Sequence, residues 1–441
     1  MLTLLAYSMV VVFMALIMTD RLSALLALIL VPLVFAVLGA LLGVSSGDIG
    51  PMVLNGIRNL APTGVLLLFA ILYFGTMIDA GLFDPVARAV LRLVHGDPVR
   101  IVVGTAILAT VVSLDGDSST SYIITTSAML PLYRRLGMNP LIAPCVIMLA
   151  AGNTNLTPWG GPTARAASAL HVDVNDLFVP LVPTMVGCFL FTLGVAYVLG
   201  RRERARLGVG DIRELDRVAA PLGGEVDTAD PAPPERRPHL LWVNLGLTMA
   251  LMACLLSGVL PLPVLFMIGF ALAMLINYPD LREQKARIAA HAPNVLAVVS
   301  LIFAASVFTG VLSGTGMVEA MARSVTAVIP EGAGRFLPAI TAVLSIPFTF
   351  FVSNDAFYFG ILPILAEAGA AYGHSAEEVG RAALVGQQVH LLSPLVASTY
   401  LLVGLCEVDF GAHQRFTLPW SLGMAGAMLV FGVVLGVIPL L

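Results

Sequence analysis

Charged side chains are scarce in this sequence. Only 11% of its 441 residues are Asp, Glu, Lys or Arg, whereas 58% are hydrophobic and the mean hydropathy is +0.95. A soluble domain carries roughly 25% charged residues, and one hydrophobic core stops growing beyond about 250–300 residues. The excess apolar surface must therefore face lipid, which excludes a soluble globular protein.

Three further absences narrow the class of protein. The four cysteines have no CxxC spacing and lie singly in or at the ends of apolar runs, which is typical of small hydrophobic residues within helices. No basic stripe is present, so nucleic acid is not an expected partner. The first apolar run has no basic stretch before it and no cleavage site after it, so we expect a retained first span and no signal peptide.

Long apolar runs are abundant, and a helix needs about 20 such residues to cross a bilayer. One segment, 201–239, differs from the rest because it is charged, rich in Pro, Gly and Ala, and poor in large apolar residues. We interpret it as a cytoplasmic linker, disordered in part, between a first half at 1–200 and a second half at 240–441. The clearest apolar runs are 2–18, 22–42, 65–77, 181–199, 295–312 and 422–441.

The two halves resemble each other. The shift along the chain that relates Gly75 to Gly310 is nearly the same as the shift that relates Pro158 to Pro394, so the matching positions between them stay in register. We call this shift the repeat offset. Chance similarity between apolar segments is the alternative, but the shared positions include Gly, Pro, Arg and Asp. Weak internal symmetry of this kind is typical of secondary transporters.

Basic residues predict the orientation of the chain, because Lys and Arg accumulate in cytoplasmic loops. One threading places every basic cluster in the cytoplasm. It gives each half five spans and one re-entrant hairpin, at about 100–133 and 336–368. Five crossings is an odd number, so the second half is inverted relative to the first and both termini lie outside. The expected fold is an all-α membrane protein with two inverted-topology repeats and two broken transmembrane helices.

Polar residues interrupt the apolar pattern at the tips of the two predicted hairpins. Such groups cost several kcal/mol if they face lipid, so they must line a cavity or bind an ion. A polar loop that reaches the surface is the alternative for the first tip, and a helix cap in an outer loop is the alternative for the second. The candidate binding residues are Asp115, Asp117, Ser118, Ser119 and Thr120 in the first tip, and Ser353, Asn354 and Asp355 in the second.

Two spans are predicted to break in mid-membrane, because Pro158 and Pro162 in one and Pro394 in the other cannot continue a helix. Each break exposes a helix N-terminus that suits an anion. Arg165 adds a carboxylate-binding guanidinium, unless it pairs with an Asp of this site or reaches the surface. His390 could carry protons, or it could be a hydrogen-bonded structural residue. The candidates are Asn153, Asn155, Thr163 and Arg165 in the first break, and Gln387, His390, Ser393, Ser398 and Thr399 in the second.

The residue types in these four segments indicate a double preference. Carboxylate and hydroxyl oxygens suit Mg²⁺ or Ca²⁺, whereas Arg165 and helix N-termini suit carboxylates. An anion partly neutralised by a divalent cation satisfies both. Asp117 and Asp355 are the candidate metal ligands, with the cation as cargo and no permanently bound cofactor. Crowded carboxylates at membrane depth are also natural proton carriers.

The motifs around these residues resemble those of a known family. LDGDSSTSYIITTSAMLPLYRRLGM, LTPWGGPTARAASAL, FVSNDAFYFGILPILAE and VHLLSPLVASTYLLVG are similar to motifs of the citrate–divalent-metal:proton symporters (CitMHS-like), within the ion-transporter superfamily. The resemblance covers the chain apart from the linker. It implies a homodimer in the cytoplasmic membrane of a bacterium, elevator-type movement, and proton-driven uptake of citrate complexed with a Mg²⁺-like or Ca²⁺-like cation.

Other functions remain open at this stage. A sodium-coupled di- or tricarboxylate carrier, or a Na⁺/H⁺ or oxyanion exchanger of the same superfamily, would use similar tips and breaks. The Asp-rich first tip favours protons or a metal over sodium without excluding sodium. An intramembrane aspartyl protease would use Asp117 and Asp355 as a dyad, but the sequence before Asp117 lacks the first Gly of a Gly-x-Gly-Asp pattern, and a protease has no use for symmetric breaks.

Overall fold

The computed structural model describes residues 1–19, 21–44, 48–94, 97–116, 118–207, 235–257, 259–327, 333–351, 354–393 and 396–440. Across these ranges all regular structure is helical, as the sequence predicts. Residues 208–234, which form most of the predicted linker, lie outside the description. The first residues of the linker, 201–207, continue the last helix of the first half. The described part of the chain resumes at Glu235, within the final residues of the linker.

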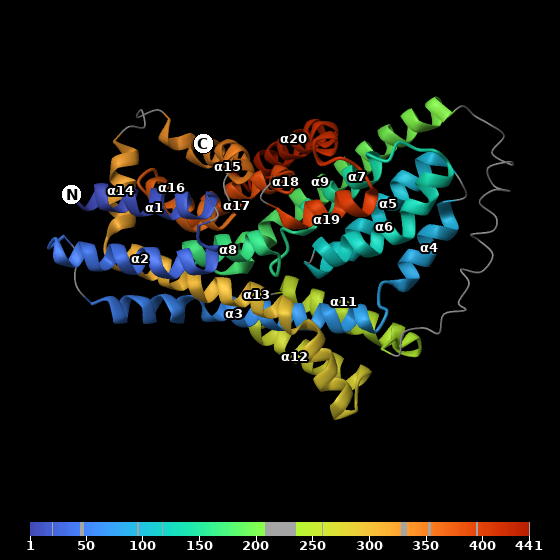
Figure 1. Cartoon of the computed structure of the whole chain (residues 1–441), viewed down its shortest axis with the longest axis horizontal. Coiled ribbons are helices and arrows are strands. Elements are labelled where there is room, and N and C mark those ends of the chain that lie inside the picture. Colours follow the sequence, from blue (N-terminus) through green and yellow to red (C-terminus); the bar gives the residue numbers. More distant parts are fainter. Residues whose placement is uncertain are drawn as a thin grey trace.

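Helices make up the described parts of both halves of the chain (Figure 1). Those before the linker are α1 (Leu2–Met18), α2 (Ala24–Leu41), α3 (Ile49–Asp79), α4 (Asp84–Val94), α5 (Pro98–Val112), α6 (Ser118–Arg135), α7 (Ile142–Thr154), α8 (Gly161–Leu170) and α9 (Val174–Leu207). Those after it are α11 (Leu241–Ser257), α12 (Leu262–Asn277), α13 (Leu281–Gly314), α14 (Met317–Thr326), α15 (Leu337–Phe351), α16 (Leu362–Ala370), α17 (Ala376–Ala383), α18 (Gln387–His390), α19 (Ala397–Cys406) and α20 (Phe410–Val434).

Seven helical segments in the described part are long and apolar enough to cross a membrane, by length and composition. A helix rises 1.5 Å per residue, so the 34 residues of α13 span about 51 Å, more than the roughly 30 Å of the hydrocarbon core. The fold is that of a multi-pass membrane protein. The seven segments are α2, α3, α9, α13, α20, residues 238–255 and residues 334–351.

Helices α3 and α13 cross closely in antiparallel directions. A Cβ atom added to Gly56 would lie 2.1 Å from the Ser306 carbonyl oxygen, and one added to Gly310 would lie 2.5 Å from the Met52 carbonyl oxygen. Only glycine lets two backbones approach this closely. The two long helices lie side by side along the long axis of the molecule (Figure 1).

The predicted break in the first half is present. Helix α7 ends at Thr154 and α8 begins at Gly161, with turns between them. The Thr163 hydroxyl donates to the Leu156 carbonyl oxygen at 2.8 Å, which satisfies one of the acceptors that a helix end leaves open. In the second half α18 ends at His390 and α19 begins at Ala397. There the Thr399 hydroxyl donates to the Leu391 carbonyl oxygen, so an equivalent hydrogen bond is present at both breaks.

Both broken helices also end alike. Helix α8 terminates at His171, with φ of 56°, and α19 terminates at Glu407, with φ of 54°. In the described part of the chain these are the two non-glycine residues with positive φ, a conformation that is uncommon outside glycine. The shift that relates His171 to Glu407 is the one that also relates Pro158 to Pro394, so the two helix ends occupy matching positions of the two halves.

Packed helix pairs occupy the two segments in which the sequence predicts hairpins. Helix α5 packs against α6, and α15 packs against α16. Gly116 turns the first tip with φ of 81°, a backbone conformation that glycine adopts without strain. After Asp355 the second tip continues as a π-helical turn at Ala356–Ile361. Such turns occur frequently at functional sites.

Candidate functional site

A cavity of about 690 Å³ lies between two groups of helices. One wall is formed by α3 and α13, through residues such as Phe74, Asp79, His291 and Asn294. The opposite wall is formed by both hairpin tips and both breaks. The predicted site residues that line it are Ser118, Asn155, Arg165, Asn354, His390 and Ser398. Segments distant in the sequence therefore converge on one space, and all four predicted interruptions contribute to it.

An ion pair between Arg165 and Asp355 joins the first break to the second tip. The Arg165 Nε atom donates to Asp355 Oδ1 at 2.7 Å, although the two residues are 190 positions apart. Their side chains are only 19% and 13% exposed. Arg165 lies in the first turn of α8, and a Cβ added to Gly161 would approach its Nη1 to 2.5 Å. Gly161 therefore leaves the space that the guanidinium occupies.

Paired amides continue this wall of the cavity. The Gln387 side chain donates to Asn354 Oδ1 at 2.8 Å and to the Tyr358 hydroxyl at 2.9 Å, and Asn354 donates back to Gln387 Oε1 at 3.3 Å. Gln387 is 1% exposed, whereas Asn354 reaches the cavity. A buried Gln whose hydrogen bonds are satisfied fixes the orientation of its partner. Gln387 thus positions Asn354, which faces the ligand space itself.

His390 lies on the cavity with one nitrogen already engaged. Its Nδ1 atom is 2.6 Å from the Thr349 carbonyl oxygen. A carbonyl oxygen only accepts, so Nδ1 carries a proton, and Nε2 is the acceptor nitrogen when the ring is neutral. Both alternatives stated for His390 are therefore compatible with its geometry: it is hydrogen-bonded to the backbone, and it keeps a second nitrogen for a proton or ligand.

Trp159, in the first break, contacts the first tip. Its indole Nε1 donates to the Leu114 carbonyl oxygen at 2.8 Å, and its ring packs on Phe74 of α3 with centroids 5.0 Å apart. Gly116 lies against this ring, because a Cβ there would approach Trp159 Cδ1 to 2.9 Å. The contacts hold the start of α6 at the cavity, where Ser118 lines it.

Helix N-termini add partial positive charge to this wall. Ser118 opens α6, Gly161 and Pro162 open α8, and Ser398 lies in the first turn of α19, and all four residues line the cavity. The first backbone N–H groups of a helix have no partner within it and attract anions. Together with Arg165, they make one side of the cavity suited to a carboxylate.

Several predicted residues do not line the cavity. The Asn153 amide donates to the Met185 carbonyl oxygen of α9 at 3.0 Å. Thr163 and Thr399 are fully buried and bond carbonyl oxygens beside the breaks, and Ser393 is fully buried nearby. None of these four residues lines the cavity, and the hydroxyls of Thr163 and Thr399 stabilise the two breaks.

The predicted metal ligand Asp117 and the tip residue Ser353 lie outside the described residues. The same applies to the side chains of Asp115, Ser119 and Thr120. Within the part that is described, no group of three or more His, Cys, Asp and Glu side chains could hold a metal ion. Of the two predicted metal ligands, only Asp355 can therefore be located, and it is paired with Arg165.

The wall made by α3 and α13 was not predicted. Asp79 Oδ2 lies 2.8 Å from His291 Nε2 and 3.2 Å from Arg287 Nη1, at the end of the cavity where α3 terminates. Asn294 follows His291 by three residues on the same face of α13. In the sequence, the signal for this wall is a pair of polar residues three positions apart just before an apolar run.

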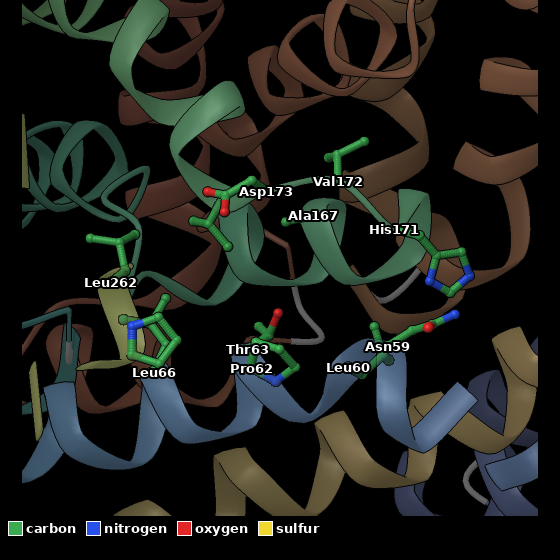
Figure 2. A pocket seen from close by; sticks show the side chains of 12 residues that line it. Asn59, Leu60, Pro62, Thr63, Leu66, Ala167, His171, Val172, Asp173 and Leu262 are labelled. Atoms are coloured by element: carbon green, nitrogen blue, oxygen red, sulfur yellow. The ribbon is translucent and has the colours of Figure 1, made fainter. Parts of the chain in front are cut away.

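A second, smaller cavity of about 310 Å³ lies farther along α3. Figure 2 shows Asn59, Pro62 and Thr63 of α3 below the end of α8, where His171 and Asp173 follow that helix. Both cavities are thus bounded by α3 and α8. The larger one lies toward the C-terminal end of α3, and the smaller one lies around its middle.

Comparison with known proteins identifies close relatives. The model of a citrate transporter family (CitMHS) matches residues 10–386. A Bacillus subtilis (strain 168) protein described as a citrate transporter is 55% identical over 439 residues, which cover 99% of this chain and all of that protein. A second B. subtilis protein, described as a Mg²⁺/citrate complex secondary transporter, is 49% identical over 438 residues, 99% of each chain.

Solved structures of more distant proteins share the fold. The YdaH transporter of Alcanivorax borkumensis matches with a TM-score of 0.58 at 15% identity, over 87% of each chain. MtrF of Neisseria gonorrhoeae matches with a TM-score of 0.56 at 15% identity, over 85% of this chain and 82% of its own. At this identity the similarity concerns the fold alone.

Proposed function

This chain belongs to the citrate transporter family, and from that premise we propose that it imports citrate as a complex with a divalent cation, coupled to protons. The family and the curated relatives are transporters, so the chain is a secondary transporter and the protease alternative falls away. The relative described as a Mg²⁺/citrate complex transporter supports the metal complex as cargo.

The Arg165–Asp355 pair is the observation that carries this proposal. A guanidinium and a carboxylate in contact at 2.7 Å satisfy each other. A metal–citrate complex brings one partner for each: a carboxylate for Arg165 and a cation for Asp355. The exchange gives each buried charge a new partner, whereas free citrate or a free cation would leave one buried charge without a partner. The pair thus favours the complex over either component.

The cation in this proposal is bound by oxygen atoms of the tips and of citrate. Mg²⁺ and Ca²⁺ take six or more oxygen ligands, and Mg²⁺ usually keeps several waters and few protein carboxylates. Asp355 can supply one such ligand, and Asp117 of the first tip is the second proposed ligand. Citrate and water complete the shell, so no cluster of three acidic side chains is required.

The inverted-repeat architecture is part of the proposal. It is supported by the repeat offset, which relates Gly75 to Gly310 and, with nearly the same shift, His171 to Glu407, and by the antiparallel packing of α3 and α13. The proposed repeats comprise 1–200 and 240–441, each with a re-entrant hairpin. The N-terminus and α14 lie at one end of the long axis, opposite α4 and the end of α9 with their arginines (Figure 1). Both termini would then face outward from the cytoplasmic membrane of a bacterium.

Alternating access is proposed to occur between the two walls of the cavity. The large cavity reaches Asp79 at the end of α3, close in the chain to the arginines of α4, which supports assigning this conformation to one open to the cytoplasm. The small cavity between α3 and the end of α8 occupies the place where an outward opening would form. An elevator-type displacement of the tips and breaks along α3 and α13, within a homodimer, would open each side in turn.

Uptake of radiolabelled citrate into proteoliposomes tests the proposal. Uptake should require Mg²⁺ or Ca²⁺ and should be driven by an inwardly directed proton gradient without sodium. Strict dependence on Na⁺ with no effect of divalent cations would favour a sodium-coupled carboxylate carrier and refute the metal–citrate cargo. Exchange of Na⁺ for H⁺ without citrate movement would indicate an exchanger of the same superfamily.

A further inference from the structure

The Asp79–His291 pair is a titratable site on the wall of the cavity that carries none of the predicted cargo ligands. His291 lines the cavity from α13, and Asp79 lines it from the end of α3. We propose that His291, oriented by Asp79, binds and releases the coupled proton at the cytoplasmic mouth of this cavity. The inference rests on the proposed function, and it assigns the proton to a different wall from the citrate complex.

The geometry fixes which nitrogen can accept a proton. His291 Nε2 lies 2.8 Å from Asp79 Oδ2, and an ionised carboxylate only accepts, so Nε2 carries the hydrogen. The lone pair is then on Nδ1. A proton from water in the cavity binds there, gives an imidazolium that keeps its bond to Asp79, and later returns to water on the cytoplasmic side. No other bond is made or broken in this cycle.

The position of the ring depends on Gly75. A Cβ added to Gly75 would lie 2.6 Å from His291 Nδ1, so the imidazole occupies the space that a side chain at position 75 would need. Gly75 itself lines the cavity. The repeat offset relates this contact to the one at the other end of the helix pair, because the shift from Gly75 to Gly310 is also the shift from Gly56 to His291. At the other end of the helix pair two glycines meet, but here one of them is replaced by a titratable ring.

Charges from every neighbouring element surround this ring. Arg287 contacts Asp79 at 3.2 Å and Glu235 at 3.2 Å, so this described chain of ion pairs has two carboxylates and one guanidinium. A proton on His291 would bring the net charge of these four groups to zero. Across the cavity Arg165 and His390 face the same space. Other charged or titratable groups near this chain of ion pairs are Arg237 paired with Glu283, Arg236 paired with Asp84, and Tyr278, whose hydroxyl donates to the Glu235 carbonyl oxygen.

Two transport measurements separate proton coupling from cargo binding. Net accumulation of citrate with Mg²⁺ under a gradient of about one pH unit can reach about tenfold per proton, because one pH unit corresponds to 1.36 kcal/mol. Exchange of labelled for unlabelled citrate–Mg²⁺ at equal pH on both sides needs no net proton movement. His291→Gln should remove accumulation and leave exchange within about twofold of wild type, a change below about 0.4 kcal/mol.

The controls make each outcome decisive. His239→Gln is the same substitution at an exposed position on the cytoplasmic side, and it should retain both activities. Asp79→Asn should lose accumulation and retain exchange, as the second test if His291→Gln does not fold. Wild-type accumulation in both cavity variants, or equal loss of accumulation and exchange, would overturn the assignment. Absence of exchange in the wild type would instead overturn the proposed cargo.

Discussion

Replacing Arg165 with alanine tests the role of the ion pair that Arg165 forms at the wall of the cavity. The guanidinium is 19% exposed and donates to Asp355 at 2.7 Å, a geometry that a citrate carboxylate can take over. A hydrogen bond to a charged group contributes about 1.5–3 kcal/mol. Its loss should weaken citrate binding by about 10-fold to 150-fold, since each 1.4 kcal/mol corresponds to a factor of ten.

The assay is initial citrate uptake in proteoliposomes, with citrate varied at saturating Mg²⁺ and then Mg²⁺ varied at saturating citrate. In Arg165→Ala both KM values should rise by this factor, because each titration varies the concentration of the citrate–Mg²⁺ complex. Arg165→Lys keeps the charge but loses the planar fork that matches a carboxylate, so its effect should be intermediate. An unchanged KM for citrate in Arg165→Ala would refute the reasoning and leave Arg165 with a structural role.

Stability must be separated from binding in this experiment. Alanine at 165 leaves the Asp355 carboxylate, which is 13% exposed, without its cation. Breaking a fully buried pair costs about 3–5 kcal/mol, and some exposure of both partners reduces this figure. The double variant with Asp355→Asn removes the orphaned charge, so it should recover thermal stability but not uptake. Arg134→Ala is the matched control, because Arg134 forms an exposed ion pair with Glu407 at 3.0 Å, away from the cavity residues.

Three other perturbations follow from the sequence and structure. Asp117→Asn should abolish metal-dependent uptake while the protein remains folded in the membrane, and wild-type uptake by this variant would remove Asp117 from the proposed metal site. Gly116→Ala should reduce the free energy of unfolding by about 1–3 kcal/mol, measured as a lower thermal midpoint, because φ is positive there and an indole ring fills the space. Gly137→Ala, where φ is also positive but the space is open, should cost less. Thr163→Val and Thr399→Val should each reduce stability by about 1–3 kcal/mol through an orphaned carbonyl oxygen, with equal stability to wild type as the contrary result.

Much of this site could be predicted from local features of the sequence. Pro158 and Pro162 indicated a break because proline cannot continue a helix, and α7 does end before them. Arg165 was expected either to bind a carboxylate or to pair with an Asp of the site, and the structure shows the pairing with Asp355. The convergence of breaks and tips was expected from polar groups that cannot face lipid, and described residues of all four segments line one cavity.

What could not be predicted depends on long-range packing and on the use of backbone acceptors. Asp79 and His291 are 212 residues apart, and no periodicity within either helix specifies their contact. Asn153 and Thr163 were expected to face a ligand because they are polar residues in an interrupted span. A broken helix also leaves carbonyl oxygens that need donors, and Thr163 meets that need at Leu156, whereas Asn153 donates to the Met185 carbonyl oxygen of the neighbouring α9.

The two ends of the α3–α13 pair show how similar halves can give an asymmetric site. At one end Gly56 and Gly310 bring the backbones into contact, so no space remains between the helices. The repeat offset relates these two glycines to His291 and Gly75, which meet at the other end, and here the larger cavity opens. Glycine at both positions closes the pair, whereas one histidine introduces a titratable ring that requires space. The proposed repeats, with their equivalent backbones, can therefore carry the proposed anion site and the proposed proton site on different walls, because the side chains at related positions differ.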